Sequence, residues 1–325
     1  MARMQGKTTS DSYQYFAGVD VSKAHLDLRL HGAMRGQRFA NDDGGIAALL
    51  ATLAASGSGP HLVVFEPTGR YHYALWRALE AAGHGTAPIN PYQARHLATG
   101  LGHHAKTDQI DATVLCLIAV RLAPQVKPAP TDFVLQIKEV FAAQRSAIKH
   151  RAMVRAQAKA SFNAVVIAHL ATVDACLTAE IKVLTATLKT LFMANPRTRR
   201  VREIVMSIPG FAEGAAATIL SRLPEIGTLT RGEIAALSGT APMTQQSGQW
   251  QGKARTKGGR RDLRSDLHMP AVSAMKNNPG LKAFAQRQKA KGKHANAIIN
   301  AVLRKLLILA NALVSQNRLW TPNTP

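Results

Sequence analysis

The pattern of hydrophobic and polar residues changes its period several times within the first 124 residues. Short runs rich in β-branched and aromatic residues alternate there with longer runs of helical period. The runs predict strands over 15–21, 25–32, 37–40, 61–66 and 85–90, and helices over 45–55, 71–82 and 109–122. Three strands followed by helix, strand, helix, strand and helix are typical of a ribonuclease-H-like α/β sheet.

The pattern becomes helical after a boundary with three prolines in seven residues, 124–130. No Gly or Pro occurs from Thr131 to Asn195, which predicts one or two long helices with Thr131 as the N-cap. The apolar positions do not keep a strict heptad, so an antiparallel helical hairpin or a packed stalk is favoured over a long parallel coiled coil. This segment is expected to be a spacer or an oligomerisation arm.

The remaining residues predict short helices separated by one long basic loop. Two helices meet around Ile208, Pro209 and Gly210, a helix-hairpin-helix-like segment whose glycine N–H groups can hold a phosphate. An ordinary helix turn explains the same residues equally well. A loop over 241–267 follows, and then helices to about Leu319. The predicted organisation is a disordered tail (1–14), an α/β domain (15–127), a helical arm or coiled coil (128–196) and a mainly helical domain (197–319).

Charge separates the two halves of the chain. The formal net charge is +22 and the pI is about 10.7. Residues 1–130 carry 12 Lys and Arg against 9 Asp and Glu, a net charge of +3, whereas residues 131–325 carry 29 against 10, a net charge of +19. Such an excess raises phosphate affinity through counterion release, so DNA or RNA is the expected partner of the second half.

Two other classes of protein are disfavoured by the sequence. Cys116 and Cys176 lie 60 residues apart without metal-ligand spacing, so neither a structural zinc site nor a disulfide framework is expected. The sequence has no apolar signal region, no lipidation signal and no run of 18 uncharged apolar residues. We therefore expect a cytoplasmic, nucleoid-associated protein that does not bind a membrane.

Four carboxylates in the first third of the chain are candidates for a metal site. Asp20 and Glu66 lie at the ends of predicted strands, and Asp108 and Asp111 are spaced i, i+3 on one predicted helix face. Carboxylate oxygens are the ligands that Mg²⁺ prefers, and a pair of ions about 3.5–4 Å apart can clamp a phosphoryl group.

Each acid also has a structural explanation when it is taken alone. An Asp at a strand end is usually a turn or cap residue, and Asp108 could be an N-cap. Glu66 follows the apolar run 62–65 directly, where an unpaired acid would be costly to bury. The ordered set favours the metal site, whereas Asp27, Asp42 and Asp43 lack such placement and are expected to be solvated.

Four ordered motifs resemble the insertion-sequence 110 family of transposases, also called Piv/MooV or DEDD recombinases. They are GVDVSK, FEPTGRY, KTDQIDA and SGQWQGKARTKGGRRDLRSDL, and the likeness runs from about Phe16 to about Leu313. The resemblance implies an N-terminal RuvC-like domain, a coiled-coil arm and a C-terminal transposase domain. It implies Asp20, Glu66, Asp108 and Asp111 as the acidic set and Ser247 as a nucleophile.

The resemblance also implies partners that composition does not specify. The nucleic-acid partners are donor and target DNA and a structured bridge RNA that pairs with both. The resemblance also implies a homo-oligomer in which dimers pair into a tetramer. Trp250 has no matching family role. His103 and His104 adjoin the third motif and are expected to be an exposed loop pair, although contact with substrate is the alternative.

Basic residues follow Ser247 closely and would neutralise a pentavalent phosphate. The candidates for binding nucleic acid are Lys253, Arg255, Lys257, Gly258, Gly259, Arg260, Arg261 and Arg264. A solvated basic face explains the cations as well, and a Gly pair forms turns as readily as it permits close approach to phosphate.

The sequence thus predicts an RNA-guided DNA recombinase that acts through a phosphoserine with Mg²⁺ assistance. One alternative is a metal-dependent nuclease of the Holliday-junction type, in which water attacks and Ser247 is irrelevant. Another is a nucleic-acid-binding protein without catalytic activity.

Overall fold

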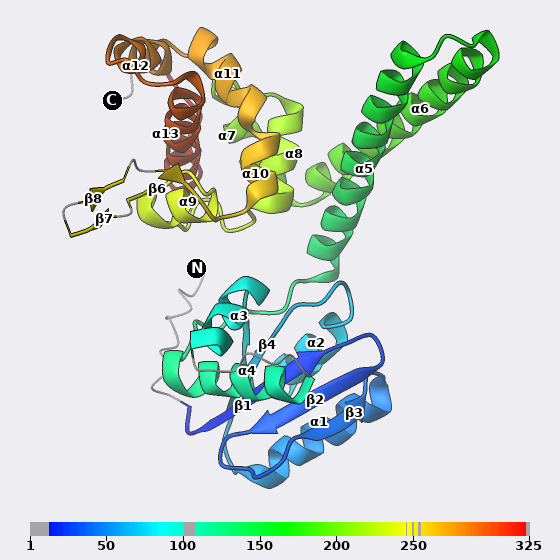
Figure 1. The fold of residues 1–325 in the computed structure, drawn as a ribbon, viewed down its shortest axis with the longest axis vertical. Helices are drawn as coiled ribbons and strands as arrows, with labels where there is room; N and C mark the ends of the chain where they lie inside the picture. Colours follow the sequence, from blue (N-terminus) through cyan, green and yellow to red (C-terminus); the bar gives the residue numbers. More distant parts are fainter. Residues whose placement is uncertain (1–12, 101–107, 245, 249, 253–254, 323–325) are drawn as a thin grey trace. The chain divides into compact units, whose positions relative to one another are not determined.

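The chain forms two compact units, Met1–Pro130 and Thr131–Pro325, in this computed structural model. The structure describes residues 13–100, 108–244, 246–248, 250–252 and 255–322. Figure 1 shows a mixed α/β arrangement in the first unit and mainly helices in the second. The predicted combination of an α/β region followed by a helical region is confirmed.

A five-stranded sheet forms the centre of the first unit, in the order β3-β2-β1-β4-β5. The β1–β2 and β2–β3 pairs are antiparallel, and the β1–β4 and β4–β5 pairs are parallel. The strands are β1 (Tyr15–Val21), β2 (His25–Leu30), β3 (Gln37–Ala40), β4 (His61–Phe65) and β5 (Gly85–Pro88). All five predicted strands are present, because alternation and a buried apolar run both carry a strong signal.

Helices cover both faces of this sheet. They are α1 (Asp43–Ser56), α2 (Tyr73–Ala81), α3 (Pro91–Gly100) and α4 (Asp108–Leu122). One face packs Val19 and Phe65 against Leu49 of α1 and Leu75 of α2. The other face packs Leu62 and Val64 against α3 and α4. Strand residues therefore alternate between two separate cores, as the period of a strand requires.

An antiparallel helical hairpin, α5 (Asp132–Ala160) and α6 (Ala164–Ala194), begins the second unit. Its helices are linked by Gln144–Thr185 (2.7 Å) and Arg155–Asp174 (2.6 Å) hydrogen bonds, pairs that only an antiparallel arrangement brings together. The predicted N-cap is confirmed, since the Thr131 hydroxyl accepts the Val134 N–H at 3.4 Å. The base of the hairpin packs Phe141 and Phe192 against Ala217.

The rest of the second unit is a helical body with one large apolar core. Its helices are α7 (Pro196–Ser207), α8 (Glu213–Arg222), α9 (Arg231–Leu237), α10 (Arg261–Asp266), α11 (His268–Asn277), α12 (Pro279–Ala290) and α13 (Ala295–Ser315). The predicted turn at Pro209 is confirmed: it separates α7 from α8, and Gly210 takes φ +109° beside Ala274.

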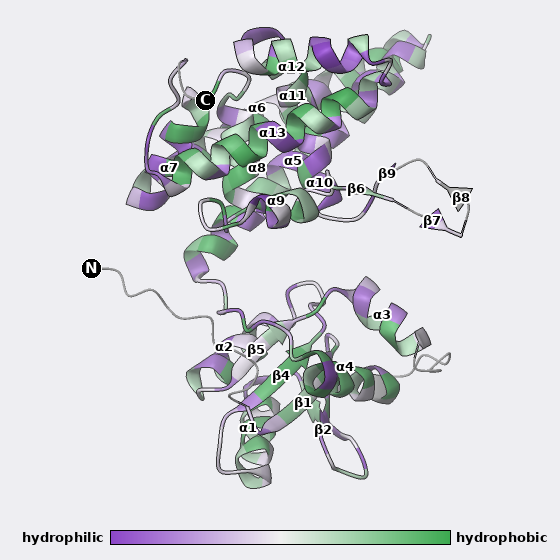
Figure 2. Ribbon diagram, turned by 90° about the vertical axis from the view of Figure 1, so that its left-hand side faces the viewer, coloured by the Kyte–Doolittle hydropathy of each residue, from purple (hydrophilic) through white to green (hydrophobic). Residues whose placement is uncertain are grey.

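Two helices among the described residues, α6 and α13, are long and apolar enough to cross a membrane by composition. The core helix of a soluble protein meets the same criteria, and α13 buries Val302, Leu306 and Leu313 in the core of the second unit. Figure 2 shows the apolar residues of α13 among the neighbouring helices of that unit. Helix composition alone is therefore weak evidence for a membrane span.

Candidate functional site

Asp20 and Glu66 lie at the carboxyl ends of two adjacent parallel strands. The last paired residues of β1 and β4 are Val19 and Phe65, and Asp20 and Glu66 come next along each strand. Because side chains alternate along a strand, both acids belong to the face that carries Gly18 and Val64, which is the face covered by α4. The carboxyl edge of parallel strands is where open α/β sheets commonly bind their ligands.

Gly18 lets helix α4 lie directly against β1. A Cβ atom at this position would come within 2.3 Å of the Ala112 carbonyl oxygen and 2.2 Å of the Cys116 backbone nitrogen. Both contacts are with backbone, which a side-chain rotation cannot relieve. The glycine therefore fixes how closely the acid-bearing helix approaches the strand that carries Asp20.

Asp111 of α4 and Glu66 line the same cavity, which has a volume of about 480 Å³. Both residues are partly buried, as is Asp20. Asp108 is the first residue of α4, one turn before Asp111, but its side chain lies outside the described residues. The structure thus places Glu66 and Asp111 on the wall of one cavity and Asp20 on the same sheet face.

The donor chemistry of this sheet edge fits a hard divalent cation. Among the described side chains no group of three or more Asp, Glu, His or Cys forms a ready-made metal cluster. The acids that the structure does place all offer carboxylate oxygens from separate rigid elements, and this is the ligand type that Mg²⁺ selects. The residues that would hold the ion are Asp20, Glu66 and Asp111, with Asp108 as the predicted fourth.

Helix α3, which the sequence analysis did not predict, forms another wall of the acid cavity. Tyr92, Arg95 and His96 line the cavity together with Glu66 and Asp111. The His96 ring lies 3.9 Å from the Tyr92 ring, between centroids, and its Nδ1 is 2.9 Å from the Tyr92 carbonyl oxygen. Asn90-Pro91 at its start was a signal for a helix N-terminus, since Pro is favoured in the first turn.

Asp27 is not solvated, contrary to expectation. Its side chain is 5% exposed, and Arg38 donates to both carboxylate oxygens at 2.9 and 3.1 Å. Asp27 is also the cross-strand partner of Asp20. Asp27 is therefore a further acid beside the candidate site. Its charge is neutralised by an arginine that binds both carboxylate oxygens, the geometry best suited to a carboxylate.

Ser247 lies on an exposed β-hairpin rather than in an unstructured loop. Strands β6 (Pro242–Met243) and β9 (Arg255–Thr256) pair at its base, and β7 (Gln246–Ser247) and β8 (Trp250–Gln251) pair toward its tip. Ser247 is opposite Trp250, next to Gly248 with φ +56°. The side chain of Trp250, and all of Lys253, His103 and His104, lie outside the described residues.

The glycine pair after the hairpin makes an internal contact. A Cβ atom on Gly259 would come within 2.2 Å of the Gly239 nitrogen, and Gly259 takes φ +66°. Arg264 Nη1 donates to the carbonyl oxygens of Gly239 (2.9 Å) and Gly258 (3.0 Å). These contacts hold the hairpin base against the end of α9. Gly259 therefore does permit a close backbone approach, but the backbone that approaches it is that of Gly239 in the same chain.

Arg260 also has internal partners. Its guanidinium donates to both carboxylate oxygens of Glu225, at 2.8 and 2.5 Å, and to the Arg222 carbonyl oxygen at 2.6 Å. The nearby Lys138 ammonium has its pKa lowered by burial and by the charge of Arg260, while Glu225 acts in the opposite direction.

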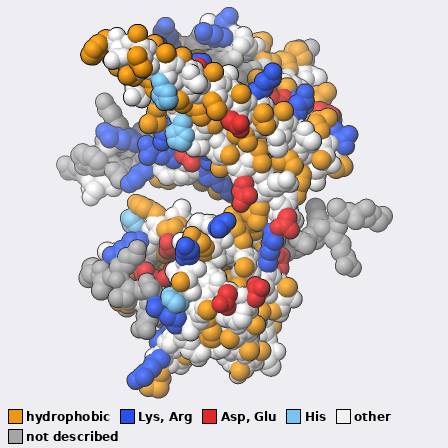
Figure 3. Space-filling view, turned by 90° about the vertical axis from the view of Figure 1, so that its right-hand side faces the viewer, with side chains coloured by type: hydrophobic (Ala, Val, Ile, Leu, Met, Phe, Trp, Pro, Cys, Tyr) orange, Lys and Arg blue, Asp and Glu red, His pale blue; other side chains and the backbone are white. Residues whose placement is uncertain are grey.

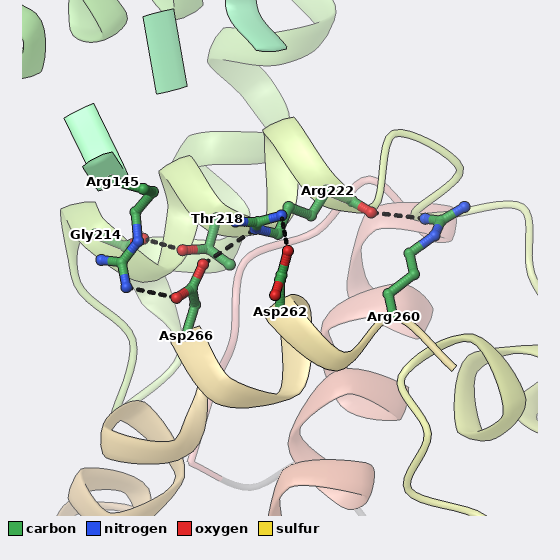
Figure 4. Close-up of polar contacts among 7 residues, drawn as sticks. All are labelled: Arg145, Gly214, Thr218, Arg222, Arg260, Asp262 and Asp266. Carbon is green, nitrogen blue, oxygen red and sulfur yellow. Dashed lines mark hydrogen bonds and ion pairs between the residues drawn. The ribbon is translucent and has the colours of Figure 1, made fainter. Parts of the chain in front are cut away.

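A charge network joins the helical hairpin to the body of its own unit. Arg222 donates to Asp262 at 3.1 Å and to Asp266 at 3.0 Å, and Arg145 of α5 donates to Asp266 at 2.5 Å (Figure 4). Asp266 is largely buried, so its carboxylate requires these two partners. The network fixes α10, the helix that follows the basic loop.

Three of the predicted nucleic-acid-binding cations form no ion pair with a described residue. Arg255, Lys257 and Arg261 are exposed. On the face drawn in Figure 3, Lys and Arg side chains gather along one border of the second unit. The exposed cations could contact phosphate without first breaking an internal salt bridge, in contrast to Arg260.

The fold and these two candidate sites define a class of protein that acts on nucleic acid, and comparison with known proteins narrows this class to transposases. Residues 17–167 match the model of DEDD transposases of the IS110 type, and residues 202–286 match the model described as transposase IS116/IS110/IS902 family.

Two relatives are similar over nearly the whole chain. The pilin gene-inverting proteins of Moraxella bovis and Moraxella lacunata are each 25% identical over 312 residues, covering 93% of this chain and 96% of theirs. A protein of insertion element IS110 from Streptomyces coelicolor is 28% identical over 39% of this chain and 31% of its own. The chain therefore belongs to the IS110 family of transposases, which are DNA-recombining enzymes.

Proposed function

We propose that this transposase is an RNA-guided recombinase that cuts and rejoins DNA through a phosphoserine at Ser247, assisted by Mg²⁺ at the acidic sheet edge. The observation that carries the proposal is the convergence of Asp20 and Glu66 on one sheet face, with Asp111 in the cavity of Glu66. The name of the Moraxella relatives, pilin gene-inverting protein, supports a reaction in which cleavage is followed by rejoining.

Topology supports a ribonuclease-H-like, RuvC-like assignment of the first unit. Its strand order 3-2-1-4-5, with an antiparallel β1–β2–β3 meander and parallel β4 and β5, places the strand-end acids beside a helix that supplies further acids. We further propose the predicted division into the α/β metal domain (15–127), the arm (128–196) and the transposase domain (197–319).

Transesterification keeps the energy of the phosphodiester bond in the ester between protein and DNA, so the proposed reaction needs no nucleoside triphosphate. Ser247 Oγ attacks the scissile phosphorus, the Oγ–P bond forms, and the P–O3′ bond breaks. The serine loses its proton, and the leaving 3′ oxygen gains one. A 3′-OH from another strand then attacks the phosphoserine, so the DNA bond re-forms and the serine is released.

The residues of the chain have separate tasks in this reaction. Bound Mg²⁺ would supply Lewis-acid stabilisation of charge on the phosphate oxygens. Asp20, Glu66 and Asp111 would orient the phosphate group through the ion, and exposed Arg255, Lys257 and Arg261 would attract the DNA backbone to the serine hairpin.

The bridge RNA and the assembly belong to the same proposal. A guide explains how an enzyme of this kind finds both donor and target DNA, and the +19 charge of residues 131–325 supports binding of several nucleic-acid strands. We also propose a dimer that pairs into a tetramer. As a DNA-acting transposase the protein is expected in the cytoplasm, and we propose that it associates with the nucleoid.

Replacing the serine tests the chemistry against the nuclease alternative. Ser247→Ala is expected to abolish recombination while DNA affinity stays unchanged, because only the nucleophile is removed. Ser265→Ala, an exposed serine on α10, is the matched control and should keep full activity. Undiminished strand cleavage by Ser247→Ala would instead favour attack by water. Wild-type protein that binds DNA but never cleaves it under any condition would favour the binding-protein alternative.

The guide requires a separate measurement. Protein purified from its host should carry a discrete RNA, and recombination should fall to background after ribonuclease treatment and return when that RNA is added back. Full recombination by RNA-free protein would contradict guidance without contradicting the serine chemistry.

A further inference from the structure

A second cavity, of about 520 Å³, lies among α11, α12 and α13, apart from the serine hairpin in sequence. Each helix contributes one face to it, because the lining residues are spaced three or four apart. Those of α12 span two turns, from Lys282 through Ala285 and Gln286 to Lys289. Figure 1 shows the three helices packed together in the second unit. Apart from Lys293, which lies between α12 and α13, the lining residues thus belong to rigid helices.

The cavity has an apolar interior and a cationic rim. The apolar lining consists of Val272, Met275, Ala285, Ala295, Ile298 and Ile299, and the cations are Lys276, Lys282, Lys289 and Lys293. The whole segment 267–325 contains nine Lys and Arg and no Asp or Glu. No acidic residue that the structure describes lines the cavity, so the four lysines repel one another and an anion at the rim would stabilise the group.

These lysines differ from the arginines that hold the unit together. Arg145, Arg222 and Arg260 are committed to Asp and Glu partners at 2.5–3.1 Å. None of the four lysines forms an ion pair with a residue that the structure describes, and all four are exposed. Their charge therefore remains available to a ligand.

We propose that this cavity is a nucleotide subsite that takes one unpaired base of a single-stranded nucleic acid. The base enters the apolar interior, and the phosphates on either side bind the lysines of the rim. The volume falls within the range of pockets that hold small organic ligands, roughly 300–1,000 Å³. Bases stacked within a duplex cannot enter such a concavity, so the ligand is unpaired. The inference rests on the proposed function in that it assumes nucleic acid as the polyanion.

Photo-crosslinking tests the position of the base. Single-stranded DNA and RNA oligonucleotides that carry 5-iodouracil are irradiated with the full-length protein, and cross-linked peptides are identified by mass spectrometry. We expect cross-links to the peptides that contain Met275, Gln286 and Ile299, and comparison of the two probes shows whether DNA or RNA is preferred. Cross-links confined to other peptides, or equal cross-linking of a duplex probe at this cavity, would overturn the proposal.

Binding measurements test the two parts of the cavity separately. Lys282→Ala with Lys289→Ala should reduce the slope of log affinity against log salt by about 1.4 for a single strand, since two phosphate contacts are lost. Lys291→Ala, which removes one charge from the adjacent turn but does not line the cavity, is the control and should change the slope by less than half as much. A change of half the size, as expected for one of several equivalent charges, would indicate only a diffuse basic surface and overturn the subsite.

An uncharged plug tests the apolar interior. Ala295 is exposed at the cavity, so Ala295→Leu should narrow it without unfolding the protein. The wild type should bind a normal oligonucleotide more tightly than an abasic one of the same length, and the plug should remove this difference. Equal binding of both probes by the wild type would overturn the inference.

The outcomes also separate this inference from the proposed function. Cross-links at the cavity that persist in a protein without recombinase chemistry would leave the subsite standing and remove the recombinase mechanism. Normal recombination with no base at the cavity would remove the subsite and leave the recombinase mechanism standing.

Discussion

The acidic sheet edge and the serine hairpin differ in how the protein holds them. Asp20 lies near the end of β1 and Glu66 directly follows β4, two strands with buried central residues, and Gly18 fixes the helix that carries Asp111. Ser247 is exposed on a pair of two-residue strands. Packing therefore positions the acids, whereas the serine is presented outward, which would suit the nucleophile that we propose.

Among changes that leave Ser247 in place, removing an acid should cause the largest loss of activity. Glu66→Gln and Asp111→Asn keep the shape of each side chain but remove its charge, and we expect recombination to fall by about 10²–10³-fold or more, the range seen when one preorganised electrostatic group is lost. The rate of strand exchange at saturating Mg²⁺ measures this. Asp43→Asn, an exposed acid in the first turn of α1, is the control and should leave the rate unchanged. Equal rates in all variants would show that the sheet edge is not part of the reaction.

Adding one methyl group at Gly18 should destabilise the first unit. Gly18→Ala forces Cβ onto the Ala112 carbonyl and the Cys116 nitrogen, so α4 must shift, at a cost of about 1–3 kcal/mol. Thermal unfolding should show a lower Tm, and the activity at low temperature should fall as well, because Asp111 moves with the helix. Gly83→Ala offers a comparison, since Gly83 has open space but φ +81°: it tests backbone strain without the clash. A wild-type Tm for Gly18→Ala would contradict the proposed role of this glycine.

Two adjacent arginines distinguish internal from external roles in the basic segment. Arg260→Ala breaks the Glu225 pair and should lower the free energy of unfolding by about 1 kcal/mol, the upper range for a partly exposed pair. Arg261→Ala should leave stability unchanged and instead reduce the salt dependence of DNA binding by about one phosphate contact. Urea unfolding and binding titrations over a range of salt separate these effects. A loss of stability in Arg261→Ala together with a loss of salt dependence alone in Arg260→Ala would refute this division of roles.

A pH-dependent loss of stability is the smallest expected effect, and it concerns the opposite edge of the sheet. Burial, and then the charge of His84, lower the pKa of His61 below its usual 6.5, and burial lowers that of His84. The unfolded chain therefore binds protons first as the pH falls. The contribution of the two neutral histidines to the free energy of unfolding is fully present above about pH 6.5. It decreases as the pH falls from there toward the lowered pKa values of the folded protein. The Tm of His61→Gln should depend less on pH over this window. An unchanged pH dependence in this variant would exclude His61 as the source.

The sequence predicted the sheet better than it predicted the residues around the site. Strands β1 and β4 have alternating or fully apolar runs, and such runs can be recognised from neighbouring residues in the sequence. Helix α3 was missed because it contains few large apolar residues, and the serine hairpin was missed because two-residue strands leave no pattern. Asp27 was wrongly expected to be solvated, since its pairing with Arg38 depends on strand register. The internal partners of Arg260 could not be predicted either, because Glu225 lies 35 residues away in sequence.

We propose that the acidic sheet edge and the serine serve one reaction, and this can be tested by capturing the ester between protein and DNA. Purified protein is incubated with guide RNA, Mg²⁺ and DNA, denatured, and analysed by mass spectrometry for a nucleotide on the Ser247 peptide. We expect this adduct in the wild type and in Asp43→Asn, and its absence in Ser247→Ala and in Asp111→Asn. An adduct of wild-type yield in Asp111→Asn, or one at another residue, would show that the acids and Ser247 do not act in the same reaction.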